Sequence, residues 1–172
     1  LMGNTIIAKP SEITPLTANL LAETLLELGL PNGVFNLVHG LGPEVGQAIL
    51  EHPKIKGISF TGGTETGRIV ARTAAPMFKK LSLELGGKNA TIILKDADLD
   101  KAVDGAVRAA FTNSGQVCLC GSRIFIDASI VEQFTRRFIE KVNAIKIGDP
   151  MDEHTTMGSV ISPEHLLKVE SY

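Results

Sequence analysis

The chain has 172 residues with a formal net charge of −2, and 44% of its residues are hydrophobic. This composition is typical of a soluble globular protein that is long enough to bury a core, and the small net charge argues against nucleic acid as a partner. No apolar run reaches the roughly 20 residues of a membrane helix, and no secretory leader is recognisable. Because two cysteines do not make a disulfide framework, we expect a reduced, cytoplasmic setting.

The first half of the sequence alternates between short apolar strands and helices. The first helix is predicted to begin with Thr14 as its N-cap and Pro15 at its first position, and to end at Gly29. Two further helices are predicted over 43–51 and 64–75. Strands are predicted where short β-branched or apolar runs are bounded by turn residues, at 5–9, 34–38, 57–60 and 81–85. This alternation predicts an α/β fold with a parallel sheet and crossover helices.

The pattern starts again after the glycine pair at 86–87, which we interpret as the boundary between two α/β blocks. Strands are predicted at 91–94 and 123–126, and Asp98 is expected to cap the helix between them. From residue 148 onward the sequence is rich in turn residues.

A further helix is predicted after the strand at 123–126. Ser129 and Glu132 have the spacing of a capping box at its start. Its buried face is predicted from apolar residues at i, i+4 spacing, namely Ile130, Phe134, Phe138 and Val142.

Three segments that follow predicted strands could hold an anionic cofactor. Residues 40–46, GLGPEVG, nearly match the dinucleotide fingerprint but contain one residue too many. Residues 60–67, FTGGTETG, either place a helix start against a pyrophosphate or form a turn required only by chain geometry. Lys9 and Glu12, at the end of the first strand, could bind ribose hydroxyls or form a solvated surface pair.

Glu84 lies in the strand LSLEL, where the leucines point to one face while Ser82 and Glu84 point to the other. A carboxylate buried here would be costly unless it were hydrogen-bonded or protonated, and burial would raise its pKa toward that of a general base. The alternative is an edge-strand glutamate that faces water.

Both cysteines, Cys118 and Cys120, lie in the stretch SGQVCLCGSR between a predicted helix and a predicted strand. A zinc site needs about four ligands, but the histidines show no ligand spacing, and a redox pair usually reads C-x-x-C. Either thiol could fill a core. The polar, glycine-rich turn around Cys118 would also suit a reactive nucleophile, with backbone N–H groups free to stabilise an oxyanion.

Five segments in this order and spacing resemble the aldehyde dehydrogenases, the NAD(P)-dependent superfamily. They are GNTIIAKPSEITPLTA (3–18), PNGVFNLVHGLGPEVG (31–46), FTGGTETG (60–67), LELGGKN (83–89) and NSGQVCLCGSR (113–123). The wording of the last two segments is also similar to the hydroxymuconic and aminomuconic semialdehyde branch. The resemblance covers the whole chain.

The resemblance implies roles for individual positions. Cys118 would be the nucleophile and Glu84 the general base. Glu12 would favour NAD over NADP, because it would repel a 2′-phosphate. Lys9 and Glu12 would bind the adenosine ribose of the cofactor, and Gly42 and Gly46 would lie beside its adenine. Gly62 and Gly63 would face the pyrophosphate, and Leu85 would contact the nicotinamide. No metal is implied.

The resemblance implies oxidation of an aldehyde to a carboxylic acid through a Cys118 thioester, in an oligomer of identical chains. Residues 1–86 would be the C-terminal part of the NAD-binding domain, and 87–172 the N-terminal part of the catalytic domain. The family's chains are longer, so we expect this chain to be a central fragment with doubtful activity of its own. Alternatives are a non-catalytic fragment that folds and oligomerises, and a cofactor-independent cysteine esterase.

Overall fold

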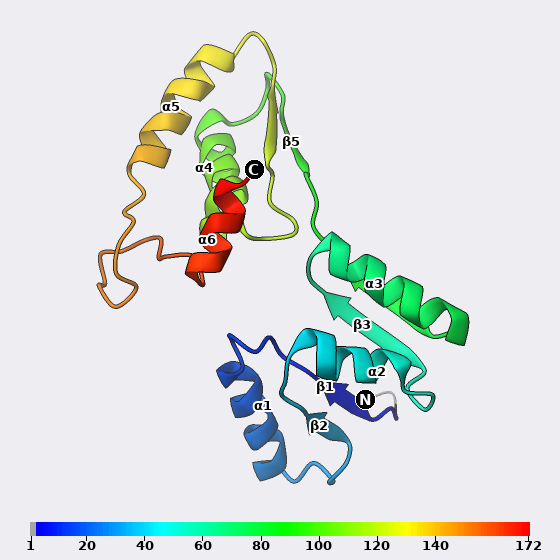
Figure 1. The fold of residues 1–172 in the computed structure, drawn as a ribbon. Coiled ribbons are helices and arrows are strands. Elements are labelled where there is room, and N and C mark those ends of the chain that lie inside the picture. The colour runs from blue at the N-terminus through cyan, green and yellow to red at the C-terminus, as the bar shows by residue number, and fades with distance from the viewer. Residues whose placement is uncertain (1–2) are drawn as a thin grey trace. The chain divides into compact units, whose positions relative to one another are not determined.

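The computed structural model describes residues 3–172, which form two compact units, one ending at Glu84 and the other beginning at Leu85 (Figure 1). Every strand pair in the described chain is parallel, and helices connect the paired strands. The predicted α/β class with crossover helices is therefore confirmed. The assignment of the two units to a cofactor-binding and a catalytic domain remains a prediction.

The unit that ends at Glu84 contains two strand pairs. Strand β1 (Ile6–Ala8) pairs with β2 (Phe35–Leu37), and helix α1 (Leu16–Glu27) connects them. Strand β3 (Gly57–Thr61) pairs with β4 (Lys80–Glu84) along its whole length. The remaining elements of this unit are α2 (Gln47–Glu51), α3 (Thr64–Ala74) and a 3₁₀ turn, Ala75–Met77.

The predicted helix over 43–51 is divided in the structure. Its first part is a π-helical turn, Gly42–Gly46, and only the residues after it form the regular helix α2. Gly40, just before this turn, has a φ of 144°, and a Cβ there would lie 2.3 Å from Val45 Cγ2. Only glycine fits both the backbone conformation and this close approach.

The unit that begins at Leu85 has one parallel pair, β5 (Ala90–Ile93) with β6 (Arg123–Ile126). Its helices are α4 (Leu99–Phe111), α5 (Val131–Asn143) and α6 (Pro163–Glu170), and a 3₁₀ turn, Thr112–Gly115, follows α4. The core of this unit is a cluster of buried residues from the sheet and two helices, Ile93, Val103, Ala106 and Phe134. The ring of Phe138 stacks on that of Phe134 at 5.8 Å, so the predicted apolar face of α5 is confirmed.

Helix caps separate correct from incorrect sequence predictions. Asp98 caps α4 as predicted, because its side chain accepts a hydrogen bond from the N–H of Lys101. The capping box at Ser129 is wrong, since the Ser129 hydroxyl donates to Asp127 and no side chain caps α5. Thr14 is likewise not the N-cap of α1: its N–H closes a turn with Ser11.

Helix α6 was not predicted, although the sequence carries its cap. Ser162 accepts a hydrogen bond from the N–H of His165, and Pro163 occupies the first turn, where a missing N–H costs nothing. Its eight residues are too short to show a clear helical period.

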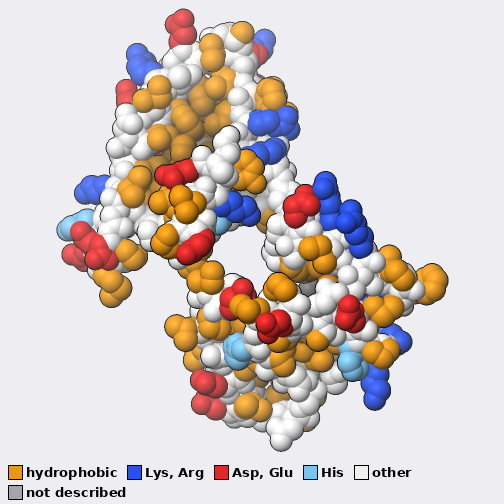
Figure 2. Space-filling view, in the orientation of Figure 1, with side chains coloured by type: hydrophobic (Ala, Val, Ile, Leu, Met, Phe, Trp, Pro, Cys, Tyr) orange, Lys and Arg blue, Asp and Glu red, His pale blue; other side chains and the backbone are white. Residues whose placement is uncertain are grey.

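Hydrophobic side chains also reach the surface of each unit (Figure 2). On α1, Leu16 and Leu20 are exposed, and on the sheet of the other unit Ile92 and Phe125 are exposed beside each other. Among residues 3–172, no helix is long and apolar enough to cross a membrane.

Candidate active site

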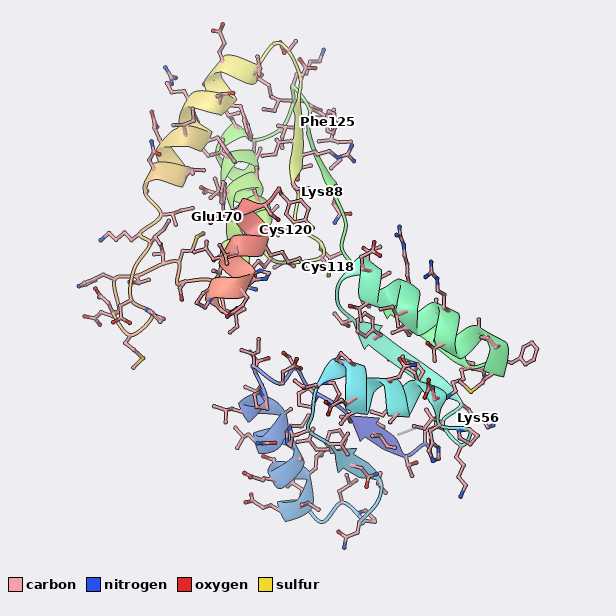
Figure 3. All side chains as sticks on the ribbon, viewed as in Figure 1. Lys56, Lys88, Cys118, Cys120, Phe125 and Glu170 are labelled. Carbon is pink, nitrogen blue, oxygen red and sulfur yellow. The ribbon has the colours of Figure 1, made fainter. Side chains whose placement is uncertain are left out.

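The loop between α4 and β6 carries both cysteines (Figure 3). The N–H of Cys120 donates to the carbonyl of Val117 at 2.8 Å, which closes a turn over residues 117–120. Cys118 is exposed on this turn, whereas Cys120 is buried. The structure thus presents one thiol to solvent and packs the other.

The backbone before this turn is strained. Asn113 and Ser114 both adopt left-handed conformations, with φ values of 52° and 56°. Non-glycine residues in this region cost about 1–3 kcal/mol each, and such strain is concentrated at functional sites. The surrounding structure therefore fixes the path by which the chain leaves α4 and reaches Cys118.

Two hydrogen bonds fasten the loop to the rest of its unit. The Nδ2 of Asn89 donates to the carbonyl of Cys118 at 2.8 Å, and the N–H of Gly121 donates to the carbonyl of Ala109 at 3.0 Å. Among residues 3–172, the N–H groups of Cys118 and Leu119 donate to no other group. The turn therefore combines a fixed backbone with N–H groups that can donate hydrogen bonds to an anionic partner.

Glu84 is the last residue of β4, and its side chain is exposed. Leu81 and Leu83 are half-buried while Ser82 and Glu84 are exposed, so the predicted alternation of this strand is confirmed. Of the two alternatives predicted for Glu84, the structure of this unit shows the glutamate that faces water and not the buried carboxylate. Leu85, which follows it, is half-buried.

The glycine pair after β3 is tied to the end of β4. The N–H of Gly62 donates to the carbonyl of Glu84 at 3.0 Å, so this N–H is occupied and not free for a phosphate. A Cβ on Gly62 would lie 2.5 Å from the Phe60 ring, so glycine fits this turn best. Gly63 is the N-cap of α3 without any side-chain hydrogen bond, so the first-turn N–H groups of α3 lack a side-chain cap.

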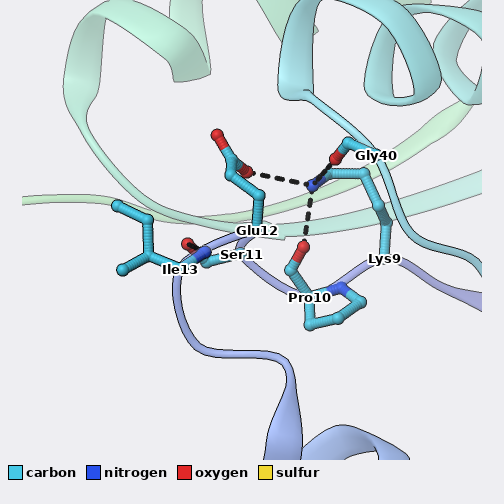
Figure 4. Close-up of polar contacts among 6 residues, drawn as sticks. All are labelled: Lys9, Pro10, Ser11, Glu12, Ile13 and Gly40. Carbon is cyan, nitrogen blue, oxygen red and sulfur yellow. Dashed lines mark hydrogen bonds and ion pairs between the residues drawn. The ribbon is translucent and has the colours of Figure 1, made fainter.

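Lys9 and Glu12 lie together at the carboxyl ends of β1 and β2 (Figure 4). The Nζ of Lys9 donates to the carbonyls of Pro10 at 2.7 Å and Gly40 at 2.9 Å, and it lies 3.5 Å from the Glu12 carboxylate. The ammonium group therefore has as many partners as protons. The pKa of Glu12 is lowered, first of all by a hydrogen bond from its own backbone N–H. Burial opposes this shift, and the charge of the neighbouring Lys9 lowers the pKa further.

The π-helical turn Gly42–Gly46 directly follows the backbone that Lys9 holds at Gly40. Turns of this kind are rare and occur frequently at functional sites. The first unit therefore brings Lys9, Glu12 and this turn to one edge, and Gly62 with Glu84 to the carboxyl ends of β3 and β4. Cys118 belongs to the other unit.

Two polar residues of these regions were not predicted from the sequence. Asn89 is part of the segment LELGGKN, but no role was predicted for it, and its hydrogen-bond partner Cys118 is 29 residues away in the sequence. Lys79 is buried, and its Nζ donates to the carbonyls of Leu50 at 2.5 Å and His52 at 2.8 Å. Burial, helped by the neighbouring charge of Lys56, lowers the pKa of Lys79. Neither contact has a local sequence signal.

No group of three or more His, Cys, Asp or Glu residues within 3–172 could hold a metal ion.

Residues 1–172 match the sequence model of the aldehyde dehydrogenase family. The chain belongs to the aldehyde dehydrogenase family. The predicted family is therefore confirmed, and it is a family of oxidoreductases.

Curated members of the aldehyde dehydrogenase family agree with the predicted branch. The chain is 49% identical over 170 residues to 2-aminomuconic semialdehyde dehydrogenase of Homo sapiens, and 48% identical to 2-aminomuconic 6-semialdehyde dehydrogenase of a Pseudomonas species. Each match covers 99% of this chain and 35% of the relative. The chain thus spans about a third of the length of these curated relatives.

Solved structures show the same fold. Betaine aldehyde dehydrogenase from Staphylococcus aureus, in complex with NAD+, is 46% identical with a TM-score of 0.92 over 98% of this chain and 33% of that chain. An NADP-dependent enzyme of E. coli is 40% identical, with the same TM-score, over 97% of this chain and 35% of its own. Structural relatives of this aldehyde dehydrogenase chain therefore include both cofactor types.

Proposed function

We propose that this chain carries the nucleophile and part of the cofactor site of an NAD-dependent aldehyde dehydrogenase that oxidises an aldehyde to a carboxylic acid. The observation that carries the proposal is the exposed thiol of Cys118 on a fastened turn, beside N–H groups without partners in the described chain. Family membership supplies the reaction class.

In this proposal the Cys118 thiolate attacks the aldehyde carbonyl carbon, a C–S bond forms, and the carbonyl electrons move to oxygen. The N–H groups around Cys118 stabilise this oxyanion. NAD, when bound, would supply the hydride acceptor. The C–H bond of the former aldehyde carbon would break, the oxyanion electrons would re-form the C=O bond, and Cys118 would be left as a thioester. Glu84 would take a proton from a water molecule while the oxygen of that water attacks the thioester carbon. The C–S bond then breaks and releases the carboxylic acid and the Cys118 thiolate.

The residues of the first unit fit a dinucleotide. The start of α3, at Gly63, has N–H groups without a side-chain cap, which suits a pyrophosphate. Gly42 and Gly46 would lie beside the adenine, and Gly62 would contribute its lack of a side chain, since its N–H is already occupied. Leu85, the first residue of the other unit, would contact the nicotinamide.

Glu12 supports NAD as the cofactor. Its side chain is 45% exposed, and a carboxyl group whose pKa lies below the ordinary value of 4.5 is ionised at neutral pH, as an unperturbed one also is. A carboxylate can accept hydrogen bonds from ribose hydroxyls, whereas it repels a 2′-phosphate. Lys9, whose ammonium protons have partners within the unit, would hold Glu12 and the Gly40 carbonyl in place for this contact.

The names of the curated relatives suggest 2-aminomuconic semialdehyde as the first aldehyde to test.

We further propose that the active protein is an oligomer of identical chains, as expected for the family. Light scattering at a series of protein concentrations would measure the mass of the assembly, and a monomer at all concentrations would contradict this part of the proposal.

Cofactor reduction, followed by absorbance in the full-length protein with NAD and the aldehyde, tests the function. We expect Cys118→Ala to lower the rate by about 10³-fold or more, because the covalent route is lost. Cys120→Ala is the matched control, since it removes the buried thiol two residues away and should retain most of the rate. Undiminished turnover in Cys118→Ala would refute the nucleophile, and ester hydrolysis that needs no NAD, with no aldehyde oxidation, would favour the esterase.

A further inference from the structure

Asn89 lies directly before β5, where its backbone is already fixed by the sheet. Its carbonyl accepts the N–H of Arg123 at 3.3 Å, and the side chain of Arg123 donates to the carbonyl of Lys88 at 3.0 Å. The amide side chain of Asn89 is therefore held on a rigid base. From this base it reaches the cysteine loop, which lies 29 residues further along the chain.

The target of Asn89 is the peptide next to the reactive thiol. Its Nδ2 donates to the carbonyl of Cys118 at 2.8 Å, a short and direct hydrogen bond. A Cβ added to Gly87 would lie 3.5 Å from this carbonyl and 3.6 Å from Asn89 Nδ2, so residues 87–89 pack against the bond. The bond is thus part of a packed contact between the start of β5 and the loop.

We propose that Asn89 is a positioning residue for Cys118. The peptide that joins Cys118 to Leu119 is planar, so a bond that fixes its carbonyl also fixes the direction of the Leu119 N–H and one side of the Cys118 Cα. This orients the turn for attack on a carbonyl group and for stabilisation of the resulting oxyanion. The inference rests on the proposed function, because it assumes that Cys118 is the nucleophile.

Two reactions of the same thiol separate positioning from simple exposure. Iodoacetamide alkylates a thiolate by displacing iodide from carbon, without a tetrahedral oxyanion, so its rate reports access to Cys118. With p-nitrophenyl acetate the thiolate attacks the ester carbonyl, a tetrahedral oxyanion forms and p-nitrophenolate leaves, so this rate also requires oriented N–H donors. Both rates are measured in the full-length protein with Cys120→Ala, and the labelled residue is identified by mass spectrometry.

Asn89→Leu removes the amide donor at nearly constant size. We expect its acylation rate to fall by about tenfold, part of the 10²–10³-fold cost of losing one oxyanion donor, with alkylation within about twofold of the parent. Asn36→Leu is the matched control, because Asn36 also donates from Nδ2 to backbone carbonyls, those of Ile6 and Gly33, but in the other unit. It should change neither rate by more than about twofold. Asn89→Gln, which keeps an amide donor, should recover part of the acylation.

The outcomes distinguish the inference from the function on which it rests. If Asn89→Leu acylates as fast as the parent, or if both of its rates change together, Asn89 has no positioning role. If the parent itself is not acylated at Cys118, the nucleophile assignment fails and the inference fails with it. Acylation lost selectively in Asn89→Leu, and not in Asn36→Leu, supports the inference.

Discussion

The two units of this chain are stabilised in different ways. The unit from Leu85 onward has a continuous apolar cluster around Phe134, and its cysteine loop leaves directly from α4, one of the helices in that cluster. The unit that ends at Glu84 buries Leu50, Val70 and Ala74, and a buried lysine, Lys79, joins its elements through the backbone carbonyls of Leu50 and His52. The comparison indicates that Cys118, the proposed nucleophile, belongs to a unit with a continuous apolar core, whereas Lys9 and Glu12, the proposed ribose-binding pair, are held by polar contacts.

The largest expected effect is in the apolar unit. Phe134→Ala should lower its free energy of unfolding by about 3–5 kcal/mol, because a fully buried aromatic ring is replaced by a cavity. Hydrogen exchange followed by mass spectrometry, peptide by peptide, would locate the loss. Equal loss of protection in the peptides of residues 3–84 would show that the two units unfold together.

The next effect is in the other unit. Lys79→Met should lower its free energy of unfolding by about 2 kcal/mol, because the charge-assisted hydrogen bonds to the carbonyls of Leu50 and His52 are lost. Lys80→Met, at an exposed neighbouring position, is the matched control. Denaturant unfolding measures both variants, and an unchanged midpoint for Lys79→Met would contradict the role of this lysine.

A smaller effect should distinguish the true helix cap from the predicted one. Asp98→Ala should cost about 1 kcal/mol, because the N–H of Lys101 loses its partner at the start of α4. Ser129→Ala, at the predicted cap of α5, should not have the cost of a lost cap, because the Ser129 hydroxyl contacts only Asp127. Thermal unfolding compares the two variants, and equal losses would contradict the caps described here.

The smallest effect is expected in acid. The pKa of Asp127 is lowered, first by the hydroxyl of Ser129 and then by its N–H, and the pKa of Glu12 is also lowered. An unfolded chain therefore binds more protons below the ordinary values of 3.8 and 4.5, so the stability from these groups is present above those values and is lost as the pH falls below them. Denaturant midpoints measured across this range should fall less in Asp127→Asn and Glu12→Gln than in the parent.

Local patterns predicted much of the fold. The alternation from Leu81 to Glu84 gave the two faces of β4, the spacing of Phe134 and Phe138 gave the buried face of α5, and Asp98 marked a helix start. Each of these signals is contained within one element. A pattern within one element is sufficient because the period of the element determines which side chains share a face.

The errors and omissions come from competition and from distance. Ser129 has the spacing of a cap, but the carboxylate of Asp127, two residues earlier, binds its hydroxyl and N–H. Asn89 and Lys79 donate hydrogen bonds to backbone carbonyls that lie 27 to 29 residues away in the sequence. Because every residue has a backbone carbonyl, the sequence does not indicate which one a side chain will bind. Motif resemblance pointed to Cys118 and Glu84, but only the structure could find the amide that holds the Cys118 carbonyl.

Because the two thiols differ in burial, the number of thiols that a reagent labels can measure whether the chain is folded. Cys118 is exposed and Cys120 is buried, and the sequence contains no other cysteine. A maleimide dye should therefore attach to one residue of the native chain and to two residues of the unfolded chain. The mass added by a brief labelling pulse would then measure the folded fraction directly, without any substitution or tag.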